Sequence, residues 1–179
     1  MPKILQPKNY FKCVLDIDHE IFSANGIIAV ILDLDNTLAP WKATDFPKEI
    51  IEWIAKLKET GICFCLVSNG RSERVANIVQ AIDIPFVSGA QKPRKKAFLT
   101  AMAIMESQPE NTAVIGDQIF TDVLGGNRLG LFTILVEPID RKKEFKTTKI
   151  LRIAEKILIR RKKLRNIKGV RSSRGTGEK

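Results

Sequence analysis

The sequence has only one histidine, His19, and only three cysteines, Cys13, Cys63 and Cys65. A single histidine argues against a Ser-His-Asp triad built on it and excludes a zinc site made of several histidines. An odd number of cysteines in a chain without an export signal indicates reduced thiols in the cytosol. Cys63 and Cys65 lie two residues apart in a predicted strand, so we expect them to be buried as small hydrophobic side chains.

Long hydrophobic runs are also missing. No apolar stretch approaches the ~18 residues that a membrane-spanning helix needs, and the segment from Met1 to Leu5 has no signal-peptide pattern. Hydrophobic residues nevertheless make up 44% of the 179 residues, which is enough for one domain with a substantial core. The sequence therefore predicts a soluble, cytoplasmic protein.

Acidic residues are scarce in one part of the chain only. Residues 1–140 carry 14 Lys and Arg against 17 Asp and Glu, whereas residues 141–179 carry 16 against 3. The whole basic excess of the chain, +10 in net charge, therefore comes from the C-terminal segment. Such asymmetry indicates an anionic partner for this segment, or a solvated arm whose charges repel one another.

The basic segment shows helical periodicity. Within residues 141–168, Ile150, Ile153 and Ile157 recur at helical spacing between basic residues, which predicts a basic amphipathic helix. This helix is expected either to dock on the domain or to lie on an anionic membrane, at the inner face of the membrane in the second case. Residues 169–179 are rich in Gly, Ser and Arg, and we expect them to form a disordered tail.

The N-terminal residues 1–26 are expected to form a leader helix before the first core strand. Val14, Ile17 and Phe22 fit a short amphipathic helix that ends at Gly26. We expect this helix to pack against the sheet, although its aromatic residues could instead face a membrane. The predicted domains are 1–26, the leader helix; 27–140, a domain of alternating strands and helices; 141–168, the basic amphipathic helix; and 169–179, the tail.

Strands and helices alternate through residues 27–140. The continuous aliphatic run 27–32 is typical of a strand buried on both faces of a sheet. The alternation predicts an α/β fold, a Rossmann-like open parallel β-sheet of about five strands with helices on both faces. The expected strands are 27–32, 62–67, 85–87, 112–115 and 131–136, and the expected helices include 47–60, 72–81 and 93–105.

Polar side chains follow several of these strands. The first strand ends in Asp33, Asp35 and Thr37, the second in Ser68 and Asn69, and the fourth in Asp117, with Asp122 about a helical turn later. The pattern Asp-x-Asp-Asn is also common in turns, because Asp and Asn side chains bond to the nearby backbone. However, the carboxyl ends of parallel strands lie at one edge of the sheet, and ligands bind at that edge. Two nearby carboxylates resist joint ionisation, so one can act as nucleophile while the other handles a proton.

Four segments follow one another along the chain: Asp33-Leu34-Asp35-Asn36-Thr37, Ser68-Asn69, Lys92-Pro93 and Gly116-Asp117-Gln118-Ile119-Phe120-Thr121-Asp122. In this order they resemble the four motifs of the haloacid dehalogenase-like (HAD) phosphohydrolases. The resemblance spans residues 27–136, and the second Asp of the first motif favours the phosphoryl-transfer branch over the dehalogenases. The segment Asp-Leu-Asp-Asn-Thr-Leu that begins at Asp33 resembles the YqeG-like, IIIA-type members of this family, which are relatives of the mitochondrial phosphatidylglycerophosphate phosphatases.

The resemblance implies a role for each acidic residue. Asp33 would be the nucleophile that forms an aspartyl-phosphate. Asp35 would protonate the leaving alcohol and then deprotonate the attacking water. Asp33, Asp117 and the backbone carbonyl of Asp35 would hold Mg²⁺, and Asp122 would support the metal from outside its ligand shell.

The remaining motif residues are expected to bind phosphate or to shape the site. Ser68 and Asn69 would bind the phosphoryl oxygens, and Lys92 would neutralise their charge. Thr37 would orient the loop and cap the turn that follows it. Only 35 residues separate Asp33 from Ser68, and 24 separate Ser68 from Lys92, so no cap domain fits between the motifs.

A site without a cap is open, which suits a bulky substrate. Together with the basic helix, the resemblance therefore implies a Mg²⁺-dependent phosphomonoester hydrolase that acts on a bulky or lipid-linked phosphate such as phosphatidylglycerophosphate. One alternative is a soluble phosphatase for nucleic-acid ends or small phosphate esters. The other is a non-catalytic module that binds RNA or the ribosome through the basic segment. The oligomeric state is not predicted.

Overall fold

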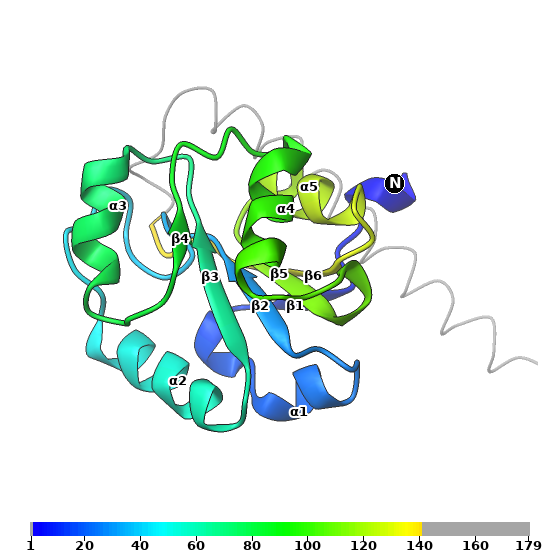
Figure 1. Ribbon diagram of the computed structural model, residues 1–179, viewed down its shortest axis with the longest axis horizontal. Helices are drawn as coiled ribbons and strands as arrows, with labels where there is room; N and C mark the ends of the chain where they lie inside the picture. Colours follow the sequence, from blue (N-terminus) through cyan, green and yellow to red (C-terminus); the bar gives the residue numbers. More distant parts are fainter. Residues whose placement is uncertain (1, 141–179) are drawn as a thin grey trace, which may run out of the picture. The chain divides into compact units, whose positions relative to one another are not determined.

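The computed structural model describes residues 2–140, so the predicted elements at 141–168 and 169–179 lie outside the described residues. The described chain forms a parallel six-stranded sheet in the order β1-β6-β5-β2-β3-β4 (Figure 1). The α/β fold with an open parallel sheet is confirmed, and the elements between residues 2 and 140 include no cap domain. The strands are β1 Asn9–Phe11, β2 Ala29–Leu32, β3 Cys63–Val67, β4 Phe86–Val87, β5 Thr112–Gly116 and β6 Phe132–Val136.

The central strand β2 is buried along its whole length, as expected for a continuous aliphatic strand covered on both faces. Its last residue, Leu32, is paired with Leu66 of β3 and with Ile115 of β5. The three strands therefore end at the same level, and the residues that follow them emerge side by side. This register brings Asp33, Ser68 and Asp117 to one edge of the sheet.

Helices cover both faces of the sheet. One hydrophobic cluster includes Phe22, Trp53 and Ile78, which come from α1, α2 and α3. A second cluster includes Phe98 and Met102 of α4 on the other face. The helices are α1 His19–Ser23, α2 Lys48–Glu59, α3 Ser72–Val79, α4 Lys95–Ile104 and α5 Leu124–Asn127.

The N-terminal segment differs from the single leader helix that was predicted. Its residues Asn9–Phe11 form β1, which pairs in parallel with β6 at the edge of the sheet. A 3₁₀ turn, Val14–Asp16, and the short helix α1 follow. A three-residue strand is too short to show the alternation by which strands are recognised in a sequence, so only its pairing with β6 reveals it.

The expected packing of this segment against the core is confirmed. Ile17 and Phe22 are fully buried, and the indole Nε1 of Trp53 in α2 donates a hydrogen bond of 2.8 Å to the carbonyl oxygen of Ile17. Phe22 is therefore not available to a membrane surface. None of the helices within residues 2–140 has the length and apolar content needed to cross a bilayer.

The two cysteines of β3 differ from each other. Cys65 is buried, as predicted, and burial raises the pKa of its thiol to about 12. Cys63 is exposed, which corrects the expectation that both would be buried. The reason is its position as the first residue of β3, where the strand enters the sheet.

Candidate active site

Asp33, the first residue after β2, lies at the centre of the polar edge. Its side chain is buried, and Thr37 Oγ1 donates a hydrogen bond of 3.0 Å to its Oδ2. The ammonium group of Lys92 forms an ion pair with its Oδ1. Thr37, which lies in the loop after β2, thus orients the carboxylate of Asp33 directly.

Lys92 connects the first motif to the last. Its Nζ also lies 2.6 Å from Oδ1 of Asp122, so the buried ammonium group bridges two carboxylates. Its backbone N–H donates a hydrogen bond of 2.8 Å to Oδ1 of Asn69. Asn69 therefore contacts the site by holding the Lys92 backbone, and the side chain of Lys92 points at Asp33 and Asp122 rather than into solvent.

Three buried carboxylates gather at this edge. Oxygen atoms of Asp33, Asp117 and Asp122 all lie within 4.8 Å of one another. Oxygen ligands with negative charge are the ligands that Mg²⁺ and other hard divalent cations prefer. The donor set therefore fits such a cation, and Asp122 belongs to the same cluster as the two aspartates predicted to bind the metal.

The position of Asp122 depends on the chain between β5 and α5. A single π-helical turn, Ile119–Val123, carries Asp122 back toward the end of β5, and such turns are frequent at functional sites. Gln118 N and Thr121 Oγ1 donate hydrogen bonds of 3.2 and 3.1 Å to its Oδ2. A Cβ atom at Gly116 would lie only 2.3 Å from Cγ of Asp122, so glycine is required there for this close approach.

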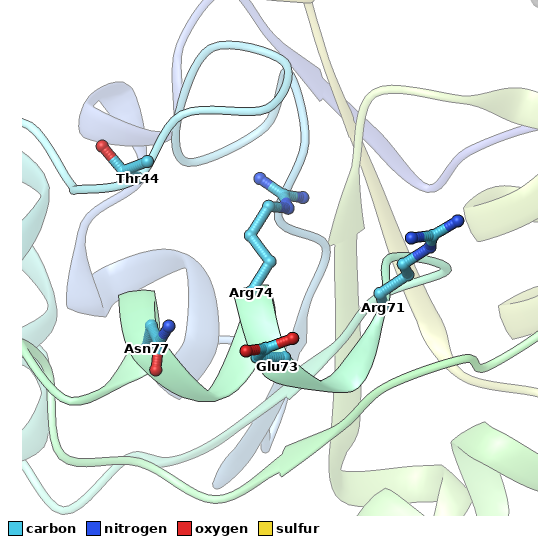
Figure 2. A pocket seen from close by; sticks show the side chains of 5 residues that line it. All are labelled: Thr44, Arg71, Glu73, Arg74 and Asn77. Carbon is cyan, nitrogen blue, oxygen red and sulfur yellow. The ribbon is translucent and has the colours of Figure 1, made fainter.

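Asp35 does not belong to the three-carboxylate cluster, and its carboxylate has other partners. Its Oδ2 accepts a short hydrogen bond of 2.5 Å from Nη2 of Arg74, and its Oδ1 accepts one of 3.0 Å from the backbone N–H of Lys42. Arg74 also donates to the carbonyl oxygen of Ala43 at 3.0 Å. Figure 2 shows Arg74 rising from α3 toward the loop that carries Thr44.

Arg74 was not predicted from the sequence. It lies six residues after Ser68 in a helix with several exposed polar residues, and nothing in the sequence distinguishes it from a solvated surface arginine. Only the packing of α3 beside the loop after β2 brings its guanidinium group to Asp35.

Ser68 follows β3 and is buried. Its backbone N–H donates to the carbonyl oxygen of Val87 at 2.9 Å, and its Oγ accepts a hydrogen bond of 3.0 Å from the backbone N–H of Gly70. The hydroxyl is therefore held in a tight turn at the same edge as Asp33. The structure thus places all the predicted site residues at this edge, with the Asp35 carboxylate turned toward Arg74.

Burial and charge act against each other on Lys92 and Asp122. Burial lowers the pKa of Lys92, but the carboxylates of Asp122 and Asp33 outweigh it and raise that pKa above its ordinary value. The pKa of Asp122 is raised from 3.8 to about 6 because burial disfavours its charged form, and the attraction of Lys92 offsets this only in part. The site thus holds a lysine that stays protonated beside a carboxyl group that resists ionisation.

The raised pKa of Asp122 predicts a pH-dependent stability in metal-free buffer. Between about pH 4 and pH 6 the folded chain binds more protons at this residue than the unfolded chain does. The free energy of unfolding should therefore fall as the pH rises through this range, by about 1–3 kcal/mol from this residue. Urea unfolding at pH 4, 5, 6 and 7 in EDTA measures the effect.

The matched variants for this measurement are Asp122→Asn and Glu110→Gln. The first should lose this component of the pH dependence. The second removes an exposed carboxylate just before the amino end of β5, and it should retain the pH dependence of the wild type. An identical pH slope in the wild type and in Asp122→Asn would show that Asp122 ionises normally in the folded chain.

Comparison with known proteins gives concordant matches. The HAD-hydrolase-like family matches residues 89–146. The probable phosphatase YqeG of Bacillus subtilis (strain 168) is 39% identical over 158 residues, which cover 88% of this chain and 92% of that protein. The chloroplastic/mitochondrial phosphatidylglycerophosphate phosphatase 1 of Arabidopsis thaliana is 28% identical over 154 residues, 81% of this chain and 44% of that protein.

A solved structure supports the fold. A HAD-superfamily hydrolase from Ehrlichia chaffeensis superposes with a TM-score of 0.53 at 17% identity, over 62% of this chain and 90% of that chain. At this identity the likeness concerns the arrangement of the sheet and helices alone. It supports the α/β fold of this chain.

Proposed function

We propose that this chain, which belongs to the haloacid dehalogenase-like (HAD) phosphatases, hydrolyses a lipid-linked phosphomonoester with Asp33 as its nucleophile. The observation that carries the proposal is the gathering of Asp33, Asp117 and Asp122 around Lys92 at one edge of the sheet. The relatives support phosphatase activity, and they do not support the alternative of a non-catalytic RNA-binding module.

In the first half of the proposed reaction, a carboxylate oxygen of Asp33 attacks the phosphorus atom of the substrate. The bond between phosphorus and the ester oxygen breaks, and the leaving alcohol takes a proton from the Asp35 carboxyl group. Thr37 fixes the orientation of the Asp33 carboxylate. Lys92 and the turn at Ser68 supply positive charge and hydrogen-bond donors to the phosphoryl oxygens.

In the second half, water attacks the phosphorus atom of the aspartyl-phosphate. Asp35, now deprotonated, takes a proton from this water, and the bond between phosphorus and the Asp33 oxygen breaks. Inorganic phosphate leaves, and both aspartates return to their starting states. Asp35 must release Arg74 or move with it to reach the reacting oxygen, because the two side chains are paired in the structure.

The buried carboxylates of Asp33, Asp117 and Asp122 fit a divalent cation. We propose that Asp33 and Asp117, together with the Asp35 carbonyl, would hold Mg²⁺, with Asp122 supporting them. The cation would offset the repulsion between a dianionic phosphate and the acidic residues around it. Asp122 contacts Lys92, Gln118 and Thr121, which favours a supporting role for it.

Two features support a lipid-linked substrate. The chain is similar to a phosphatidylglycerophosphate phosphatase over 81% of this chain and 44% of that protein. In the described part of the chain, no cap domain stands over the site to enclose a small metabolite. The basic segment 141–168 carries the charge that an anionic membrane would attract. We therefore propose that the protein works at the surface of an anionic membrane.

A phosphate-release screen with Mg²⁺ tests this proposal. Phosphatidylglycerophosphate in anionic vesicles should be hydrolysed with a kcat/KM at least about tenfold above that for sugar phosphates, nucleotides or 3′-phosphorylated oligonucleotides, a factor that corresponds to about 1.4 kcal/mol. EDTA should abolish the activity. A preference for oligonucleotide ends, or equal rates with and without lipid, would contradict the lipid part of the proposal and leave the phosphatase part intact.

A further inference from the structure

A cavity of about 300 Å³ lies beside the candidate active site. Arg71, Glu73, Arg74 and Asn77 come from α3 and the residue before it, and Thr44 comes from the loop that precedes α2. Figure 2 shows both arginine side chains extending from the start of α3 on the same side of the helix.

Arg74 connects this cavity to the reacting groups. Its Nη2 contacts the carboxylate of Asp35, which we assign as the acid and base. A Cβ atom at Gly70 would lie 3.3 Å from the same Nη2 and 3.1 Å from Oγ of Ser68. The guanidinium group of Arg74 therefore lies beside both Asp35 and the phosphate-binding turn, and the cavity extends from there along α3.

The charge of the cavity is suited to an anion. Arg74 is neutralised in part by Asp35, but Arg71 is exposed, and its guanidinium group forms no ion pair with the other residues in the described range 2–140. Glu73 also lines the cavity without an ion pair to either arginine among these residues. The planar fork of a guanidinium group matches two oxygens of a phosphate, which makes arginine the preferred side chain for phosphate recognition.

We propose that Arg71 and Arg74 form a subsite for a second phosphate of the substrate. This phosphate is the phosphodiester of a glycerophospholipid whose terminal phosphomonoester reacts at Asp33, so the inference rests on the proposed function. The lining favours a lipid over a nucleic acid, because none of the five residues is aromatic. Proteins that bind single-stranded nucleic acid stack the bases on aromatic side chains.

The kinetic test compares two substrates that differ in the second phosphate. Short-chain phosphatidylglycerophosphate carries a phosphodiester and a phosphomonoester, and glycerol 3-phosphate carries the phosphomonoester alone. The wild type should favour the first in kcat/KM. Arg71→Gln should lower the ratio of the two kcat/KM values about tenfold, mainly through KM, and Arg71→Lys should restore part of it because the charge remains.

Arg128→Gln is the matched control. Arg128 is an exposed arginine between α5 and β6, at the amino end of β6 and thus at the opposite edge of the sheet. The variant removes the same charge from the chain and should leave the ratio unchanged. If the ratio of the two kcat/KM values fell equally in Arg71→Gln and Arg128→Gln, the loss of one positive charge anywhere in the chain would explain the result. That outcome would overturn the subsite.

A binding measurement gives an answer that does not depend on turnover. In an Asp33→Asn background with Mg²⁺, calorimetry should find short-chain phosphatidylglycerophosphate bound at least about tenfold more tightly than glycerol 3-phosphate. Adding Arg71→Gln should remove this difference. Equal affinity for the two ligands while Arg71 is present, or a difference that Arg71→Gln leaves unchanged, would overturn the proposal.

Different results would overturn the phosphate subsite and the phosphatase activity. Phosphate release by the wild type with a ratio that Arg71→Gln does not alter would overturn the subsite alone. A 3′-phosphorylated dinucleotide preferred over the lipid, with the preference lost in Arg71→Gln, would overturn the lipid assignment. Full activity of Asp33→Asn would overturn the proposed function itself.

Discussion

Replacing Asp33 by Asn is expected to reduce kcat at least about 10³-fold, because the amide lacks the nucleophilic carboxylate oxygen. The geometry should change little. Thr37 Oγ1 can still donate to the side-chain oxygen, and Lys92 keeps its ion pair with Asp122. Phosphate release in the presence of Mg²⁺, measured under single-turnover conditions, tests the prediction.

The control for this variant is Glu110→Gln, which removes one carboxylate charge at the amino end of β5, far along the strand from the site. It should keep wild-type activity. Urea unfolding of both variants separates a chemical effect from a loss of structure. If Asp33→Asn retained more than about a tenth of the wild-type kcat, the nucleophile would have to be another residue.

Replacing Lys92 by Met is expected to destabilise the fold as well as to remove activity. The Lys92 side chain is 3% exposed, and its ammonium group is the cation between Asp33 and Asp122. Removing one partner of a buried ion pair leaves an uncompensated charge and costs about 3–5 kcal/mol. In EDTA, urea unfolding should show a loss of this size, and phosphate release should fall by about 10²-fold or more because the phosphoryl oxygens lose a charged donor.

Lys96→Met is the control, since Lys96 is an exposed lysine in α4, four residues further along the chain. Its replacement should change the free energy of unfolding by no more than about 0.5 kcal/mol. A Lys92→Met protein as stable as the Lys96→Met protein in EDTA would mean that the carboxyl groups around Lys92 are neutral in the folded chain. In that case, the proposed charge-neutralising role of Lys92 would be wrong.

The alternation of elements along residues 27–140 could be predicted from the sequence because each signal is local. β2 is a continuous aliphatic run, and α2 begins after Pro47 and ends before Gly61. Short elements were not predicted, because a prediction from local signals needs several residues to show a pattern. β1 has three residues, too few for a periodic pattern, and its partner β6 lies more than 120 residues away.

The motif residues were found because polar groups after buried strands are unusual, and parallel strands bring their carboxyl ends to one edge. Which atoms meet there was decided by the tertiary structure. The ion pair of Lys92 with both Asp33 and Asp122 and the pairing of Arg74 with Asp35 join residues 30 to 59 positions apart. A sequence shows the chemical type of each side chain but not its direction.

The sequence by itself therefore determined the fold class, the family resemblance and which motif residues were candidates for the site. These depend on local hydrophobic patterns and on short motifs whose order is visible along the chain. The tertiary structure alone decided that Asp35 faces Arg74, that Gly116 makes room for Asp122, and that a cavity with two arginines adjoins the site. These features depend on how α3 and the π-helical turn pack against the strand ends, and such packing between distant segments leaves no local pattern in the sequence.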